Sequence, residues 1–186
     1  MKSGAFVLAL AMVLFSVAVS QADAPIIGED KVTYRVSLEN SGDLYQIAKA
    51  HNIYESGECK KIERRDAPDG TWMEFDVTYD PLTFIASSYT YKEYDGKHTY
   101  TTKAVINDST TEFTITDETG KTWNRSLKRK EGAPPLFDPV YTYYFGSMLG
   151  KGVSSGTIQM IITHDNGFDD YLMDWKVLGT ETVDVG

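Results

Sequence analysis

Apolar and polar side chains alternate with a period of two along most of the chain beyond its first thirty or so residues. The stretch Lys31–Glu39 places Val32, Tyr34, Val36 and Leu38 on one face and smaller or charged residues on the other. This alternation is typical of a half-buried β-strand. The segment 43–54 fits a helix or a strand. We interpret it as a strand because Tyr45, Ile47 and Ile53 share a period-two face.

The middle of the chain predicts a meander of antiparallel strands. Met73, Phe75, Val77 and Tyr79 alternate with polar neighbours, and Asp95-Gly96 is a strong hairpin signal. Short polar turns separate the expected strands, which cover residues 71–79, 83–94, 97–106, 110–117 and 121–130.

The stretch PLFDPVYTYYFGSML (135–149) has a longer period and is crowded with aromatic residues. Asp138 stands where a helix N-cap would, Pro139 takes the first helical position, and Gly150 provides a stop. The prolines before it end the preceding sheet. One helix of about three turns is therefore expected. Its apolar side chains at helical spacing are Val140, Tyr141, Tyr144, Phe145, Met148 and Leu149.

Beyond this helix the pattern returns to strands at 157–164 and 171–179, joined by a polar hairpin loop at 165–170, and 180–186 also favours a strand. We thus predict a mainly β protein. Its architecture is a curved antiparallel sheet or half-open β-barrel, with one internal amphipathic helix as a lid or plug.

The N-terminal segment predicts export. Lys2 precedes an uncharged, mostly apolar run from Ala5 to Val19, and small residues at Ser20 and Ala22 suit signal peptidase. We expect a signal peptide at 1–22 and a single β-rich domain at 23–186, secreted or periplasmic, with no transmembrane anchor after cleavage. An uncleaved membrane anchor is the alternative.

Composition narrows the classes of partner. The net charge is −9 and no long basic block occurs, which disfavours nucleic acid and anionic membranes. Cys59 is the only cysteine, so no internal disulfide can form, and we expect it to be a half-buried strand residue.

Few residues suggest catalysis or metal binding. His51, His98 and His164 lack metal-ligand spacing, and DNGFDD (165–170) lacks the full calcium-loop pattern. The one Gly-x-Ser-x-Gly match, at 152–156, lies in a Gly/Ser-rich loop that leads into an expected strand rather than a helix, so it does not indicate a nucleophile elbow, and no glycine-rich loop enters a helix to bind phosphate. Paired carboxylates on facing strands are the remaining enzymatic option. We expect a non-enzymatic protein with no cofactor, no bound metal and no catalytic residues.

The aromatic helix is the main functional signal. It either fills one side of the curved sheet as core, or closes a hydrophobic cavity that binds a lipid-like ligand. Aromatic and methionine side chains offer adaptable apolar contact to such a ligand. The expected cavity lining is Tyr141, Tyr144, Phe145, Met148, Phe75 and Val77.

Three stretches carry a resemblance to a known family: YDPLTFIASSYTYKEYDG (79–96), GAPPLFDPVYTYYFGSML (132–149) and VLGTETVDVG (177–186). They resemble uncharacterised secreted bacterial proteins that are similar in fold to the lipoprotein-localisation carriers LolA and LolB. The resemblance implies a periplasmic half-open barrel with helical lids over an apolar cavity. Family members usually continue past the position of Gly186, which implies a shortened chain with an open sheet edge.

Two alternatives are kept. A lipocalin-like closed-barrel carrier would share the size and strand count, but its Gly-x-Trp pattern occurs only at 70–72, far from the first strand. An envelope assembly or adaptor protein would bind another protein through the sheet edge or an exposed aromatic helix. The cavity carrier predicts a lined space beneath the helix, whereas the adaptor predicts a filled core there.

Overall fold

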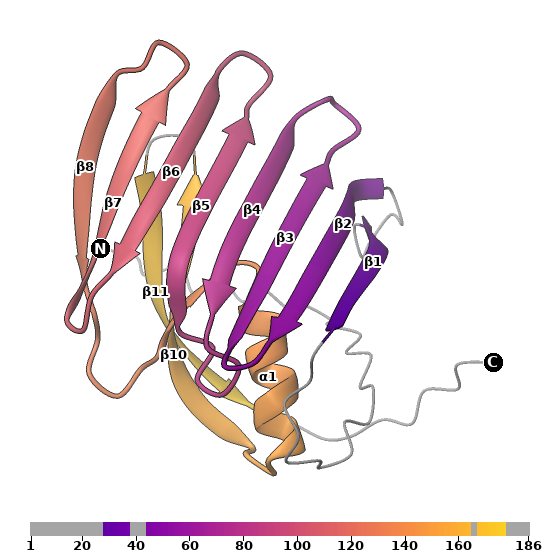
Figure 1. Cartoon of the computed structure of the whole chain (residues 1–186), viewed down its shortest axis with the longest axis vertical. Helices are drawn as coiled ribbons and strands as arrows, with labels where there is room; N and C mark the ends of the chain where they lie inside the picture. Colours follow the sequence, from indigo (N-terminus) through magenta and orange to yellow (C-terminus); the bar gives the residue numbers. More distant parts are fainter. Residues whose placement is uncertain (1–27, 38–43, 165–166, 178–186) are drawn as a thin grey trace, which may run out of the picture.

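The computed structural model describes residues 28–37, 44–164 and 167–177. Its largest element is an eight-stranded sheet in which every strand pairs antiparallel with its neighbours in chain order (Figure 1). The strands are β1 (Gly28–Ser37), β2 (Leu44–Glu55), β3 (Glu58–Asp66), β4 (Trp72–Tyr79), β5 (Ala86–Tyr94), β6 (Thr99–Ile106), β7 (Thr110–Asp117) and β8 (Thr122–Lys128). The predicted meander is confirmed.

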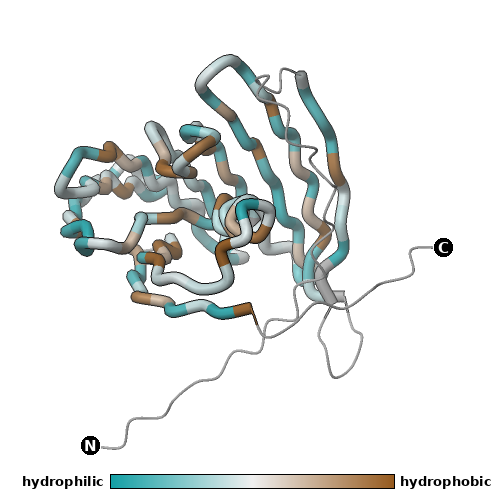
Figure 2. Tube along the Cα trace, turned by 90° about the horizontal axis from the view of Figure 1, so that it is seen from below, coloured by the Kyte–Doolittle hydropathy of each residue, from teal (hydrophilic) through white to brown (hydrophobic). Residues whose placement is uncertain are grey.

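A second, smaller layer follows the large sheet in the chain. It holds β9 (Pro135–Phe137), helix α1 (Tyr141–Gly150), β10 (Ser155–His164) and β11 (Gly167–Lys176). Strand β10 lies between β11, its antiparallel partner, and β9, its parallel partner. The large sheet curves around the helix and this small sheet, as the view from below shows (Figure 2).

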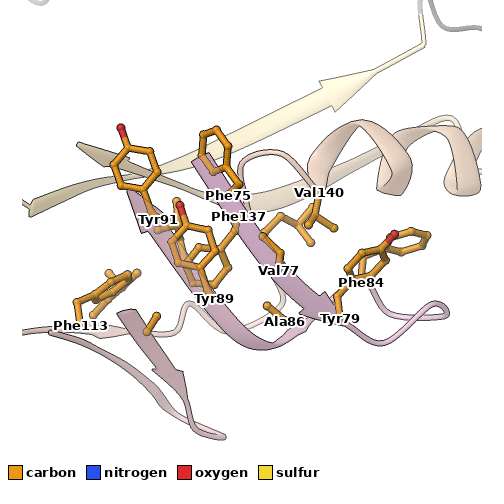
Figure 3. Packing of buried hydrophobic residues seen from close by; sticks show 14 of the residues in the cluster. Phe75, Val77, Tyr79, Phe84, Ala86, Tyr89, Tyr91, Phe113, Phe137 and Val140 are labelled. Atoms are coloured by element: carbon orange, nitrogen blue, oxygen red, sulfur yellow. The ribbon is translucent and has the colours of Figure 1, made fainter. Parts of the chain in front are cut away.

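Period-two alternation aims one face of the large sheet inward. Phe75, Val77 and Tyr79 of β4 are buried, as the pattern predicts. Tyr89 of β5 stacks on Phe137 of β9 at a centroid distance of 4.2 Å, which joins the two sheets (Figure 3). The core therefore lies between the sheets and extends to the helix.

The sheet is open. Within the described residues β1 and β8 are its two edges and do not pair with each other. A mainly β curved sheet with one helix is thus confirmed, and the lipocalin-like closed barrel is wrong. The residues described contain no helix long and apolar enough to cross a membrane.

Helix α1 ends at Gly150, as predicted, but its start is different. It begins at Tyr141, and Val140 is the N-cap, without a side-chain cap hydrogen bond. The N-cap prediction for Asp138 is wrong because its carboxylate pairs with Arg65 of β3 instead. Pro139 precedes the helix and follows a cis peptide bond.

Strand β2 is confirmed as a strand, but its inward face is the less apolar one. Gln46, Ala48, Ala50 and Asn52 are buried, whereas the side chain of Tyr45 is 51 % exposed. Strand β3 had no predicted range, although Cys59, expected on a strand, lies in it and is buried. Strand β9 was not predicted, and β11 begins at Gly167, inside the expected loop 165–170. The expected signal peptide and the strand at 180–186 lie outside the described residues.

Candidate functional site

Helix α1 lies against the end of the core, and its aromatic side chains are half-buried. Tyr144 contacts Phe84, which follows β4, and Trp175 of β11, at centroid distances of 6.1 and 6.4 Å. Phe145 lies 5.5 Å from the same Trp175 ring. Both rings of the helix therefore meet Trp175, and Tyr144 also meets Phe84.

The predicted lining residues are brought together, but in packed contact. Phe75 and Val77 are core residues with 3 % and 0 % of their surface exposed. Tyr141, Tyr144 and Phe145 are half-buried and pack against the same core. The sixth predicted residue, Met148, is also half-buried but lies outside that cluster.

Two hollows bounded by described residues are not lined by helix α1. One, of about 390 Å³, is lined by Arg125 and Ser126 of β8 and by four residues of the β10–β11 hairpin. The other, of about 110 Å³, lies over β2, β3 and β4. Beneath the helix, core side chains such as Phe84 lie in packed contact with its aromatic residues.

Beside the aromatic core lies a buried row of charges on β3. Lys61, Glu63 and Arg65 alternate along the strand and all face inward. The carboxylate of Glu63 lies 2.8 Å from the Lys61 ammonium and accepts a 2.6 Å hydrogen bond from Arg65 Nε. Lys61 is 3 % and Glu63 0 % exposed, so both ions are removed from water.

Arg65 extends this row to the small layer. Its two terminal nitrogens donate to the two carboxylate oxygens of Asp138, at 2.7 and 2.8 Å. This is the forked geometry in which arginine binds a carboxylate most strongly. Asp138 lies between β9 and α1, so the ion pair fixes the entry to the helix on the large sheet.

The charges hold one another ionised. Burial acts to raise the pKa of Glu63, but the attraction of Lys61 and Arg65 outweighs it and leaves that pKa below its ordinary value. Burial likewise acts to lower the pKa of Arg65, and Asp138 outweighs it and raises that pKa. Burial also raises the pKa of Tyr141 to about 12, so this phenol stays neutral.

Tyr143 connects the same row to the helix. Lys61 donates to the Tyr143 hydroxyl at 3.4 Å and lies 4.4 Å from the centre of its ring. The hydroxyl in turn donates to Asn52 of β2 at 3.2 Å, and Asn52 donates to Asp30 of β1 at 2.6 Å. A polar chain thus runs from the first strand through the sheet to α1.

Sequence reasoning missed this charged row and Tyr143. The stretch CKKIERRD is rich in charge, which ordinarily indicates a solvated segment. Its only useful signal is the alternation of Cys59, Lys61, Glu63 and Arg65, with the lone apolar Ile62 on the opposite face. Ile62 is 40 % exposed. The apolar pattern alone would therefore predict that the face of Ile62 is buried, which is the opposite of the observed arrangement.

The described residues also include the histidines and the cysteine that sequence analysis considered for catalysis or metal binding. They contain no group of three or more histidine, cysteine or acidic side chains arranged to hold a metal ion. His51 pairs with Glu29, and His98 with Glu118, both at the surface. Burial raises the pKa of the Cys59 thiol, which makes it a poor nucleophile.

Comparison with protein-family models, with curated proteins and with solved structures finds no match to this chain. Function must therefore be argued from the helix and from the charged row beneath it.

Proposed function

We propose that the protein is an exported, non-enzymatic binding protein for a lipid-like ligand, with helix α1 as its lid. The observation that carries the proposal is an aromatic, weakly anchored helix over the inner face of an open sheet. The N-terminal apolar segment and the resemblance to the LolA and LolB carriers support a periplasmic location.

The helix has little stability of its own. It has ten residues, no side-chain N-cap, no acidic residue in its first turn and no basic residue in its last. Isolated helices of this length are marginal in water even with good sequences. The helix is therefore held by its contacts with Lys61, Phe84 and Trp175, and it can separate from the sheet as one unit.

Ligand entry requires such a separation because the core beneath the helix is filled. Undocking exposes side chains such as Tyr144 and Phe145, whose full burial stabilises by about 1.5–3 kcal/mol each. An apolar chain regains about 0.8 kcal/mol per buried methylene group. About ten buried methylenes therefore offset the exposure of these two rings.

Titration with the fluorescent fatty acid cis-parinaric acid tests this function. We expect saturable one-to-one uptake, weakened about tenfold or more by Tyr144→Ala combined with Phe145→Ala. Tyr45→Ala is the matched control, because Tyr45 is half exposed on the opposite face of the sheet. Amide exchange should change in α1 on binding. A chain that takes up no cis-parinarate contradicts the proposal.

One observation favours a second candidate. The filled core beneath α1 suits an adaptor, and β8 pairs on one side only within the described residues. An extended segment of another protein could add to that edge. Such a partner would slow amide exchange in β8 and leave α1 unchanged. A lipid-like ligand would instead change amide exchange in α1 and leave β8 unchanged.

A further inference from the structure

The charged row suggests which ligands the lid admits, and this inference rests on the proposed function. The inner side chains of β3 carry two positive charges, Lys61 and Arg65, against the one negative charge of Glu63. The balance is restored by Asp138, which belongs to the connection between β9 and α1. The row on β3 thus carries a net positive charge, and a carboxylate from the lid segment neutralises it.

Buried ion pairs contribute little net stability. The loss of hydration commonly exceeds the attraction, and apolar residues of the same size often stabilise as well or better. Removing a single partner, in contrast, leaves a costly unpaired charge. Arg65 is 16 % exposed, and when the Asp138 side chain turns away its two terminal nitrogens lose their acceptors, while Nε keeps its hydrogen bond to Glu63.

The Asp138 side chain can release Arg65 without unfolding the connection between β9 and α1. The backbone N–H of Asp138 donates to the Ile161 carbonyl of β10 at 3.3 Å, so the main chain stays attached to the small sheet. A rotation of the Asp138 side chain, accompanied by undocking of the adjacent helix, is enough to free the forked side of Arg65. Tyr34 and Tyr141 also face this group.

Apolar surface begins directly beside the guanidinium. Arg65 lies 4.7 Å from the centre of the Phe75 ring, and Val77 and Tyr79 follow on the same inner face of β4. From Phe75 to Tyr79 this strip spans about 13 Å, given the rise of a β-strand. It ends where Tyr79 stacks on Phe84, the side chain that Tyr144 of the lid contacts.

We propose that Asp138 is an internal substitute for the head group of an anionic, single-chain amphiphile. In the bound state a carboxylate or phosphate takes the place of the Asp138 carboxylate on Arg65, and the apolar chain lies along the Phe75–Tyr79 strip. Arginine suits both head groups, because its planar fork donates two parallel hydrogen bonds and keeps its charge. The ion pair between Arg65 and Asp138 then competes with the ligand and holds the lid closed in its absence.

Affinities for four probes test the proposal: oleate, oleoyl lysophosphatidate, the neutral monoolein, and inorganic phosphate. The variant Asp138→Asn removes the internal competitor. It should tighten the binding of oleate and of lysophosphatidate about tenfold more than that of monoolein, because only the anionic head groups take the freed place on Arg65. Asp76→Asn is the control, because Asp76 pairs with Lys60 on the outer face of the sheet.

A double variant tests the same ion pair with less risk of destabilising the fold. Arg65→Met with Asp138→Leu removes both charges, which preserves stability better than removing one. It should bind oleate and monoolein equally. Thermal unfolding of each variant shows that the fold is intact.

The outcomes separate the two proposals. If Asp138→Asn changes the affinity for oleate and monoolein by the same factor, the lid is merely looser and the head-group assignment is wrong. If inorganic phosphate binds as tightly as the amphiphiles, the site takes a free anion. If no variant binds any amphiphile, the carrier function and this inference both fail.

Discussion

The inner face of the large sheet has two unlike halves. Strands β5 to β7 form an aromatic half, in which Tyr89 stacks on Phe137 of β9 (Figure 3) and Phe113 stacks on Phe168 of β11. Strands β1 to β3 form an ionic half, in which Asn52 and Lys61 meet the helix and Arg65 meets the connection before it. The first half resembles an ordinary core, and the second resembles a binding surface.

The difference teaches where stability and selectivity reside. Stacked apolar rings gain free energy without any directional requirement beyond close packing. Buried ions gain almost nothing net but penalise every wrong partner. Helix α1 and its connection, which lie on the ionic half, can therefore be replaced by a ligand of matching charge. The small sheet, which lies on the aromatic half, cannot leave without unfolding the protein.

The largest expected effect is in the aromatic half. Phe137→Ala removes a ring that is 1 % exposed and stacks on Tyr89, so it should lower the free energy of unfolding by about 3–5 kcal/mol. Phe145→Ala removes the same side chain from a half-buried place on α1 and should cost less than half as much. Urea denaturation measures both. Equal losses in the free energy of unfolding would mean that helix α1 contributes to the core as much as β9 does.

In the ionic half the loss of folding stability depends on how many of the charged side chains are replaced together. Glu63→Gln leaves Lys61 and Arg65 buried without their shared carboxylate, and should cost about 3 kcal/mol. Replacing the set together, by Lys61→Met, Glu63→Leu, Arg65→Met and Asp138→Leu, should be neutral or stabilising. Chemical denaturation of the two variants makes the comparison. A quadruple variant as unstable as Glu63→Gln would show that the ions themselves stabilise the fold.

A smaller effect is expected from acid. The pKa of Glu63 is lower in the folded chain than its ordinary value of 4.5, although burial opposes this, because Lys61 and Arg65 attract the charged form. Its contribution to stability is therefore complete above about that pH and is lost as the pH falls through the folded-state pKa. The wild type should lose more stability than Glu63→Gln over this range, measured by urea unfolding at stepped pH. Parallel curves would rule out Glu63 as the group responsible.

The smallest expected effect is a gain in the stability of helix α1. Gly146 lies within α1 with a helical backbone, and an added Cβ would meet no atom within 4 Å. Gly146→Ala should stabilise the helix by about 0.5–1 kcal/mol. Amide exchange should slow in α1 and stay unchanged in β4 to β7. Slower exchange throughout the sheet would indicate that the helix does not open independently.

The sequence alone determined the strand-rich fold and the presence of one aromatic helix. Alternation of period two identified β4 through β8, and glycine or proline turns set their ends, because these signals act over a few residues. The pattern in β4 also placed Phe75 and Val77 in the core. Each of these features is decided by a side chain's immediate neighbours along the chain.

Only the tertiary structure decided what the charges do. Lys61, Glu63 and Arg65 read as a solvated segment, and they turn inward because Asp138, more than seventy residues away in the chain, is brought to Arg65. The same contact displaced the helix start, since a carboxylate committed to a guanidinium cannot cap the helix. An ion pair of this kind depends on two distant segments meeting, and no local pattern in either one records it.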